Sequence, residues 1–356
     1  MQNIKPQDHI DIAAAVPYIL DEEYQKYNTA PLTREEKEIG EKFQMPEVGV
    51  RLIDFFFTEE DRKFILSFDG TPVSYRSLDP GYAADAFRRG VLARVRRDDT
   101  PEDPDAAADS DYDYTLNNFY GMLDVLSVSE TRRYHTLPAD LRVKLDQWYF
   151  DEYEKSLDPD PRVRPTTDEI ISLQEMLDFI DQEERPLYLA RCDCKCLGGQ
   201  AEDPTNTCIN FVHGDNSFVT RKISDRITKE QAKQIIRDAD KAGLVHTISD
   251  HGICNCNATD CYLFRVQRDR RSVGFWPKAP HIISYDANPC IGCGRCVKRC
   301  RFDVISMTGR GKDASLSFRM DECNGCGICA STCPADALHL VPRKTSAHTP
   351  QGPAET

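Results

Sequence analysis

One spacing pattern, C-x2-C-x2-C-x3-C, occurs twice near the end of this chain of 356 residues: as Cys290-Ile-Gly-Cys293-Gly-Arg-Cys296-Val-Lys-Arg-Cys300 and as Cys323-Asn-Gly-Cys326-Gly-Ile-Cys329-Ala-Ser-Thr-Cys333-Pro334. A shift of 33 positions superimposes all four cysteines. The same shift pairs the apolar residues Ile283 with Leu316, Tyr285 with Phe318, and Ile305 with Leu338. The two copies therefore form an internal repeat that carries eight thiols. Zinc sites more often use paired C-x2-C knuckles than two runs of four, so zinc and disulfides explain this repeat poorly.

This spacing resembles that of the bacterial-type 2[4Fe-4S] ferredoxin family over residues 281–341. The resemblance implies two [4Fe-4S] clusters, and the fourth cysteine of each run ligates the cluster of the other run. Cluster 1 would then be held by Cys290, Cys293, Cys296 and Cys333, and cluster 2 by Cys323, Cys326, Cys329 and Cys300. One position departs from the family pattern, because Arg301 stands where the family has proline after the fourth cysteine of the first run.

Apolar pairs flank each cysteine run and predict short strands around a small core. They are Ile282 and Ile283, Val304 and Ile305, Leu316 and Phe318, and Ala337 and Leu338. A domain of this size buries little apolar surface, so we expect its folding to depend on the metal clusters.

Composition indicates a globular protein in a reducing compartment. The net charge is −14, and 29% of the residues are charged. No apolar stretch is long enough to span a membrane, and the N-terminus has no export signal, so we expect a cytoplasmic protein. The odd total of fifteen cysteines favours metal ligation over a disulfide framework. The acidic balance disfavours nucleic acid as a partner.

The N-terminal half is expected to be mostly helical. Residues 1–45 read as a helical extension, with an apolar stretch from Ile10 to Leu20 and a charged run from Arg34 to Lys42. In residues 46–157 we expect helices at 58–68, 71–78 and 81–90, a strand at 91–95, and a further helix over 137–157. Three helices followed by a strand resemble a winged helix-turn-helix.

A basic group and an acidic loop lie next to each other in this half. The basic group is Arg88, Arg89, Arg94, Arg96 and Arg97, and residues 98–113 carry eight acidic residues. The arginines would contact DNA phosphates, neutralise the acidic loop, or dock an acidic partner protein.

A proline-rich linker at 158–165 separates this half from a cysteine-rich module at 166–280. Thr166 or Thr167 is expected to cap a helix that runs to Glu184. Thr228-Lys-Glu-Gln231 is typical of a capping box, and Gly243 is expected to end the helix that follows.

Seven further cysteines lie in this module: Cys192, Cys194, Cys196, Cys208, Cys254, Cys256 and Cys261. On an extended strand Cys192, Cys194 and Cys196 share one face, as do Cys254 and Cys256, because side chains alternate along a strand. Three interpretations remain open: a third [4Fe-4S] cluster, a structural zinc site that draws on a nearby histidine, or reduced thiols, buried or reactive. The module also resembles, more loosely, the cysteine-rich segment that precedes the dicluster domain in multi-cluster ferredoxin-like proteins of anaerobes.

Together these features predict an α+β chain with a helical N-terminal region, a cysteine-rich α+β module, a two-cluster ferredoxin domain at 281–341 and a disordered tail at 342–356. The favoured function is electron transfer by single electrons to or from a partner oxidoreductase. Two alternatives remain: a DNA-binding regulator whose clusters sense redox state, and an oxidoreductase whose upstream cysteine site is catalytic. The chain has no nucleotide-binding glycine loop outside the cluster runs, so the sequence identifies no catalytic residue.

Overall fold

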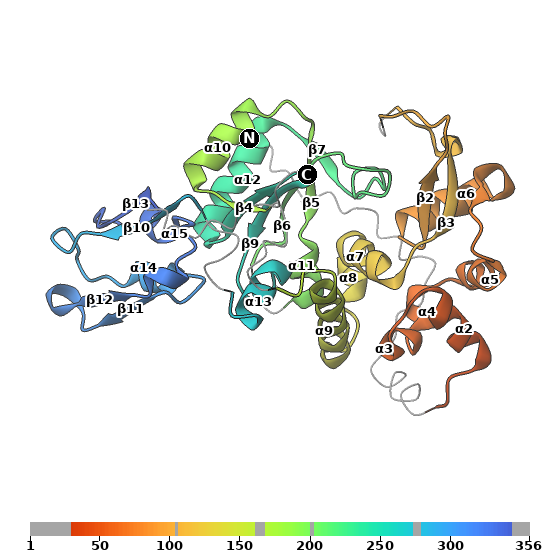
Figure 1. Ribbon diagram of the computed structural model, residues 1–356, viewed down its shortest axis with the longest axis horizontal. Helices are drawn as coiled ribbons and strands as arrows, with labels where there is room; N and C mark the ends of the chain where they lie inside the picture. The colour runs from red at the N-terminus through yellow and green to blue at the C-terminus, as the bar shows by residue number, and fades with distance from the viewer. Residues whose placement is uncertain (1–29, 104–105, 161–167, 200–202, 273–278, 344–356) are drawn as a thin grey trace, which may run out of the picture.

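The computed structural model describes residues 30–103, 106–160, 168–199, 203–272 and 279–343. Figure 1 shows helices α2 to α6 at one end of the long axis, a large sheet in the middle, and strands β10 to β13 at the other end. This mixture of helices and antiparallel sheets confirms the α+β class. The stretch from Ile10 to Leu20, most of the linker and nearly all of the tail lie outside the described residues. No helix within the described ranges is long and apolar enough to cross a membrane.

The N-terminal helices are short, and side chains cap three of them, α2, α5 and α6. They are α2 (Arg34–Lys42), α3 (Glu47–Val50), α4 (Ile53–Phe56), α5 (Glu59–Ser67) and α6 (Pro80–Arg88). Thr33 and Thr58 form capping boxes with Glu36 and Asp61. The helix expected at 71–78 is wrong: this segment forms β1 (Val73–Ser74) and one 3-10 turn (Tyr75–Ser77). Backbone pairing of Val73 with Tyr114 makes it the edge of a sheet.

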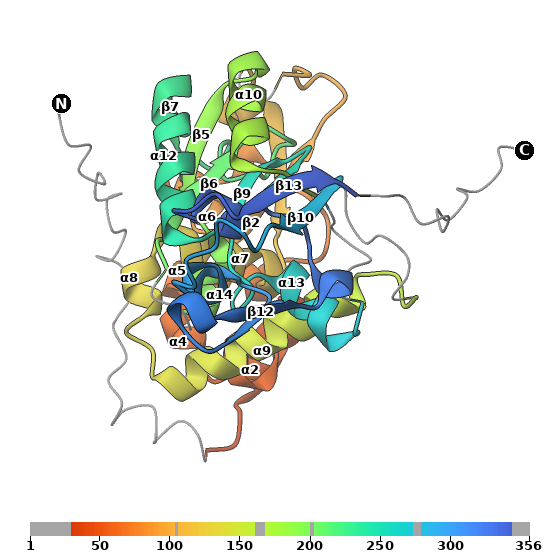
Figure 2. The same cartoon turned by 90° about the vertical axis from the view of Figure 1, so that its left-hand side faces the viewer.

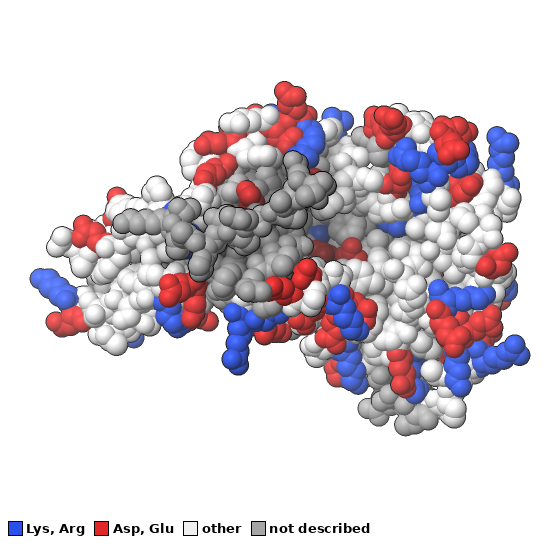
Figure 3. Space-filling model, in the orientation of Figure 1, with Lys and Arg blue, Asp and Glu red and all other residues white. Residues whose placement is uncertain are grey.

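That sheet has the order β1-β3-β2 and is antiparallel throughout, with β2 at Leu92–Arg96 and β3 at Tyr112–Leu116. Carboxylates bind most of the arginines predicted to form a basic group. Arg89 forms a buried bidentate pair with Asp61, Arg94 and Arg97 pair with acidic residues of the neighbouring loop, and Arg96 pairs with Asp215. Figure 3 shows blue and red side chains interspersed over this end of the molecule. The arginines thus neutralise acidic residues of the same chain.

The next three helices connect this region to the centre of the molecule. They are α7 (Phe119–Ser129), α8 (Thr131–Tyr134) and α9 (Ala139–Lys155). Helix α9 packs against α13 (Tyr262–Asp269), where the Tyr149 and Tyr262 rings lie 4.9 Å apart. At the same contact, Asp146 accepts hydrogen bonds from Tyr262 Oη at 2.9 Å and Arg265 Nη1 at 2.8 Å. One apolar core therefore extends from the N-terminal helices to the cysteine-rich module.

The central sheet is antiparallel and has the order β4-β8-β9-β6-β5-β7. Its strands are β4 (Glu169–Ile170), β5 (Leu187–Arg191), β6 (Asn206–Asn210), β7 (Asp225–Ile227), β8 (Val245–Ser249) and β9 (Gly252–Cys256). Helices α10 (Leu173–Gln182) and α12 (Lys229–Ala242) cover one face, where Ile180 and Ile236 pack against Ile209 and Ile253 of the sheet. Figures 1 and 2 show both helices side by side on this face.

Two helix boundaries in this module test the expected caps. The capping box of Thr228 and the end of α12 at Gly243 are confirmed. The start expected for the other helix is wrong, because α10 begins after Ser172, whose hydroxyl forms a capping box with Glu175. Strand β4 occupies the residues before it, and Thr166 and Thr167 lie outside the described residues.

The C-terminal part contains two antiparallel strand pairs and two short helices. Strand β10 (His281–Tyr285) pairs with β13 (Leu338–Pro342), and β11 (Ile305–Thr308) pairs with β12 (Ser315–Phe318). Helices α14 (Arg295–Arg299) and α15 (Ile328–Ser331) lie within the two cysteine runs and carry the third cysteine of each, Cys296 and Cys329. The strands predicted from the apolar pairs are therefore confirmed.

Candidate metal centres

The eight cysteines of the repeat line two cavities in the C-terminal part. The outer cavity is lined by Cys290, Cys293, Cys296 and Cys333, and the inner cavity by Cys300, Cys323, Cys326 and Cys329. Each cavity thus collects three thiols from one run and one from the other, the grouping that the ferredoxin resemblance implies. Apolar side chains complete the walls, including Leu316 in the outer cavity and Ile283 in the inner one.

Backbone geometry at the two cavities follows the repeat. The amide of Val304 donates to Cys300 Sγ at 3.4 Å, and the amide of Ala337 donates to Cys333 Sγ at 3.3 Å. Gly325 has φ of +74°, and a Cβ atom there would lie 2.0 Å from the carbonyl oxygen of His281. Only glycine allows the loop to pass this close to β10. Amide donors and a tight loop suit sulfur ligands that carry negative charge.

Arg301, the residue that departs from the ferredoxin pattern, joins the C-terminal part to the central sheet. Its Nε donates to Gly243 O at 2.9 Å, and its Nη2 donates to Ala242 O and Asp203 Oδ1, each at 2.8 Å. Arg299 donates to the carbonyls of Asp240 and Lys241. Both cations lie at the carboxyl end of α12, where the helix dipole favours positive charge.

Six of the seven upstream thiols lie together and form a closed ring. In order around the ring they are Cys192, Cys208, Cys254, Cys256, Cys261 and Cys194, and each thiol lies close enough to the next to shift its pKa. We call this group the thiol ring. Cys196 lies outside it, and its Sγ accepts from Thr131 Oγ1 at 3.6 Å. The structure therefore brings six of the predicted candidates together and separates one.

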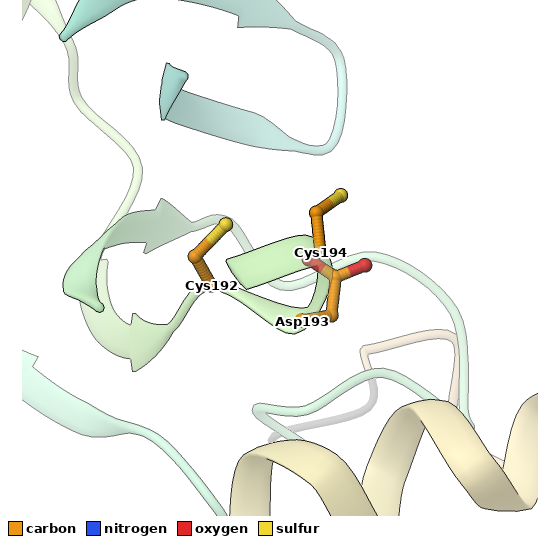
Figure 4. Close-up of side chains that lie close together, drawn as sticks. All are labelled: Cys192, Asp193 and Cys194. Carbon is orange, nitrogen blue, oxygen red and sulfur yellow. The ribbon is translucent and has the colours of Figure 1, made fainter. Parts of the chain in front are cut away.

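Four segments of the module contribute to the thiol ring, and Cys261 comes from the start of α13. Cys254 and Cys256 come from β9 and Cys208 from β6, as their neighbouring positions in the sheet require. Cys192 and Cys194 do not lie on a strand as expected, because Cys192 caps α11 (Asp193–Gly198). Figure 4 shows their sulfur atoms on the same side of this turn, with the Asp193 side chain below Cys194. One ligand atom of each of these three residues lies within 4.8 Å of the others.

A buried cation lies beside the thiol ring. Lys195 is 3% exposed, and its ammonium group donates to Pro204 O at 2.6 Å, Thr207 Oγ1 at 2.7 Å and Asn255 O at 3.0 Å. Although burial alone lowers the pKa of Lys195, the nearby thiols, Cys192 first, raise it overall. Its charge is thus held where it stabilises thiolates.

Two members of the thiol ring favour the thiolate form. Hydrogen bonds from Cys194 and Cys208 lower the pKa of Cys192 well below its usual value. Hydrogen bonds from Cys254 and Cys261 do the same for the pKa of Cys256. Burial instead raises the pKa of Cys196 to about 12. The pKa values of Cys194, Cys208, Cys254 and Cys261 are also raised, and for the first three of these, hydrogen bonds between neighbouring thiols are the first cause. Two thiols of the ring thus favour the thiolate form that metals bind.

The histidines near the upstream cysteines lie apart from the thiol ring. His246 is fully buried, and its Nδ1 lies 2.6 Å from Asn255 Oδ1. His213 and His251 contact each other, with ring centroids 4.1 Å apart, and both are exposed. The geometry thus supplies six sulfur donors and no histidine donor for the zinc interpretation.

Sequence reasoning missed two features of this site. Lys195 gives no recognisable signal, because a lysine between two cysteines is ordinarily assigned to the surface. Asp193 and Asp124 of α7 lie close enough for each carboxyl to shift the pKa of the other. Burial raises the pKa of Asp124 well above its usual value, and it raises the pKa of Asp193 to about 6.

Comparison with known families assigns the class of the C-terminal part. Residues 284–340 match the family model described as a 4Fe-4S dicluster domain. This part of the chain is therefore a ferredoxin-like iron–sulfur domain, and its cavities suit iron–sulfur binding. No curated protein and no solved structure matched the chain.

Proposed function

We propose that this chain is an electron-transfer protein or subunit with three metal centres in series. Two [4Fe-4S] clusters occupy the outer and inner cavities, each held by the four cysteines that line it. The thiol ring holds a third centre, a further [4Fe-4S] cluster bound by four of its six thiols. Iron–sulfur clusters move single electrons without rearranging their ligands, so the protein's task is to set potentials and to position the centres.

The contact between Phe264 and Phe302 carries this proposal. Their ring centroids lie 5.1 Å apart in an edge-to-face arrangement. Phe302 lines the inner cavity, and Phe264 lies three residues after Cys261 of the thiol ring. Cys326 of the inner cavity also packs against the apolar core that contains Cys261. The inner cavity is thus connected to the thiol ring through packed side chains.

The outer cavity is where the proposed relay meets its partner oxidoreductase. Cys293 is exposed, and the neighbouring Ile291 is 57% exposed. In Figure 1 the C-terminal strands form one end of the molecule, away from the N-terminal helices. Electrons would pass between this end and the thiol ring through the inner cavity.

Rapid-freeze electron paramagnetic resonance tests the order of the centres. A low-potential reductant is mixed with anaerobically purified protein, and the signal of each centre is followed in time. Phe302→Leu is expected to retain all clusters but to slow reduction of the third centre, because the edge-to-face contact with Phe264 is lost. Phe318→Leu changes another aromatic wall of the inner cavity and is the matched control. Equal rates of reduction of the third centre in the parent and both variants would contradict a relay through Phe302.

A further inference from the structure

Two histidines lie where the ferredoxin-like part meets the central sheet, and each has a carboxylate beside it. His281 begins β10, and its Nε2 lies 3.0 Å from Oε2 of Glu175, in the first turn of α10. His246 of β8 is fully buried, and its Nε2 lies 3.7 Å from Oδ1 of Asp240, near the end of α12. The Asp240 carboxylate also accepts a hydrogen bond from Ser331 Oγ of α15 at 3.2 Å. Both histidine–carboxylate pairs therefore lie at the joint between the two parts of the chain.

Hydrogen bonding on one side of the His246 ring decides which nitrogen carries a proton. Its Nδ1 lies 2.6 Å from Asn255 Oδ1, and Asn255 Nδ2 donates to Thr207 O. Asn255 Oδ1 can only accept, so His246 Nδ1 is the donor. In the neutral ring the lone pair is then on Nε2, which is buried, has no hydrogen-bond partner among the described residues, and lies next to the Asp240 carboxylate. A protonated ring instead places a donor at Nε2.

Each pair thus needs a proton between its two acceptors. Two acceptors side by side in a buried site are costly, whereas a proton between them gives a charge-assisted hydrogen bond. When His246 is neutral, repulsion is expected to turn the Asp240 carboxylate away, and its hydrogen bond from Ser331 is then lost. The Glu175 carboxylate already accepts from the amide and the hydroxyl of Ser172, so at that pair the donor has to be the His281 ring.

Other charged groups surround the two pairs. They are Asp203, Arg299 and Arg301 beside the end of α12, Asp238 and Lys241 of α12 itself, Lys195 with its hydrogen bond to Asn255 O, Glu169 of β4, and Arg343 with its hydrogen bond to His281 O. Of these residue types and histidine, only histidine ordinarily changes its charge between pH 6 and pH 8. The arginines therefore hold the joint throughout this range, and the two histidines add a contribution that depends on pH.

We propose that the two histidine–carboxylate pairs form a proton-dependent latch, closed when both rings are protonated and loosened when they lose their protons. A histidine that gains a carboxylate partner stabilises the joint at low pH, and this contribution is lost as the pH rises and the ring becomes neutral. The latch thus holds the ferredoxin-like part more firmly below neutral pH than above it. Phe264 and Phe302 meet across the same joint, so an open latch would slow the relay. That consequence rests on the proposed function, whereas the latch itself does not.

Hydrogen exchange followed by mass spectrometry tests the latch in the full metal-loaded chain at pH 6 and pH 8, after correction for the intrinsic rate of exchange. In the parent, protection of the peptides that span the end of α12 and α15 should fall by roughly 3- to 10-fold per pair between pH 6 and pH 8. The double variant His246→Gln with His281→Gln should abolish this pH dependence. His339→Gln is the matched control and should keep it, because the exposed His339 pairs with Asp336 of the same ferredoxin-like part.

A single variant covers the case in which a change at the buried His246 disturbs the fold. The His281 side chain is partly exposed, so His281→Gln should fold normally and remove the share of the pH dependence that His281 and Glu175 contribute. The latch would be overturned if the parent showed equal protection at both pH values, or if His281→Gln kept the full pH dependence of the parent. Because no electron is transferred in this experiment, its result is independent of the test of the relay.

Discussion

Replacing Arg301 with proline restores the family residue, and we expect it to undock the C-terminal domain without loss of its clusters. The backbone accepts the change, because Cys300 has φ of −72° and ψ of 107°, the extended conformation required before proline. The Arg301 side chain makes two hydrogen bonds to carbonyls at the end of α12 and one ion pair with Asp203. The ion pair is partly exposed, so it contributes about 1 kcal/mol or less.

The two hydrogen bonds from a charged donor add about 1 kcal/mol each after a discount for exposure, for a total of about 2–3 kcal/mol. Hydrogen exchange at the amides after Gly243 is the assay, since a loss of this size should speed local exchange by roughly 30- to 150-fold. Lys298→Ala removes an exposed cation of α14, three residues before Arg301, and is the control. Unchanged exchange in the proline variant, or loss of iron from the domain, would refute this account of docking.

Other consequences are expected at the thiol ring and in the N-terminal region. Lys195→Met removes the buried positive charge, so it should make the reduction potential of the third centre more negative by roughly 60 mV or more, equivalent to a tenfold change in the one-electron reduction equilibrium. A redox titration that shows no shift, or a shift to a more positive potential, would argue against this role of Lys195. Cys196→Ser should leave the metal content of anaerobic protein unchanged, since Cys196 lies outside the ring, and a loss of iron would place it among the ligands. Asp61→Ala should destabilise the N-terminal region by about 3 kcal/mol in denaturant titrations, because the buried Arg89 loses its bidentate partner and keeps only the partly exposed carboxylate of Asp85. Asp54→Ala breaks the partly exposed ion pair with Arg62 and is the comparison, with an expected loss of under about 1 kcal/mol in the free energy of unfolding.

The C-terminal domain could be predicted from the sequence because its signal is local. The spacing that identifies the metal ligands lies within each cysteine run, and the apolar pairs beside each run form the strands. Even here, the docking role of Arg301 could not be predicted, because its acceptors lie about 60 positions away at the end of α12.

The thiol ring could be predicted only in part, since it depends on which strands are neighbours. Cys254 and Cys256 alternate as a strand requires, but Cys208 meets Cys254 only through the sheet order. The period-two interpretation of Cys192 to Cys196 failed because α11 begins at this point. Asp193 in the first turn and the left-handed Gly199 at the end were the available helix signals. Likewise, Ser172 and Glu175 offered a stronger cap than Thr166 or Thr167.

Iron and sulfide analysis of anaerobically purified protein tests the central claim most directly, with Cys254→Ser measured beside the parent. Three [4Fe-4S] clusters correspond to about twelve iron ions per chain, and loss of the third centre to about eight. We expect the higher content in the parent and the lower content in the variant, with the ferredoxin-like spectrum preserved. An iron content of about eight in both proteins, with or without zinc, would contradict a third iron–sulfur centre in the thiol ring.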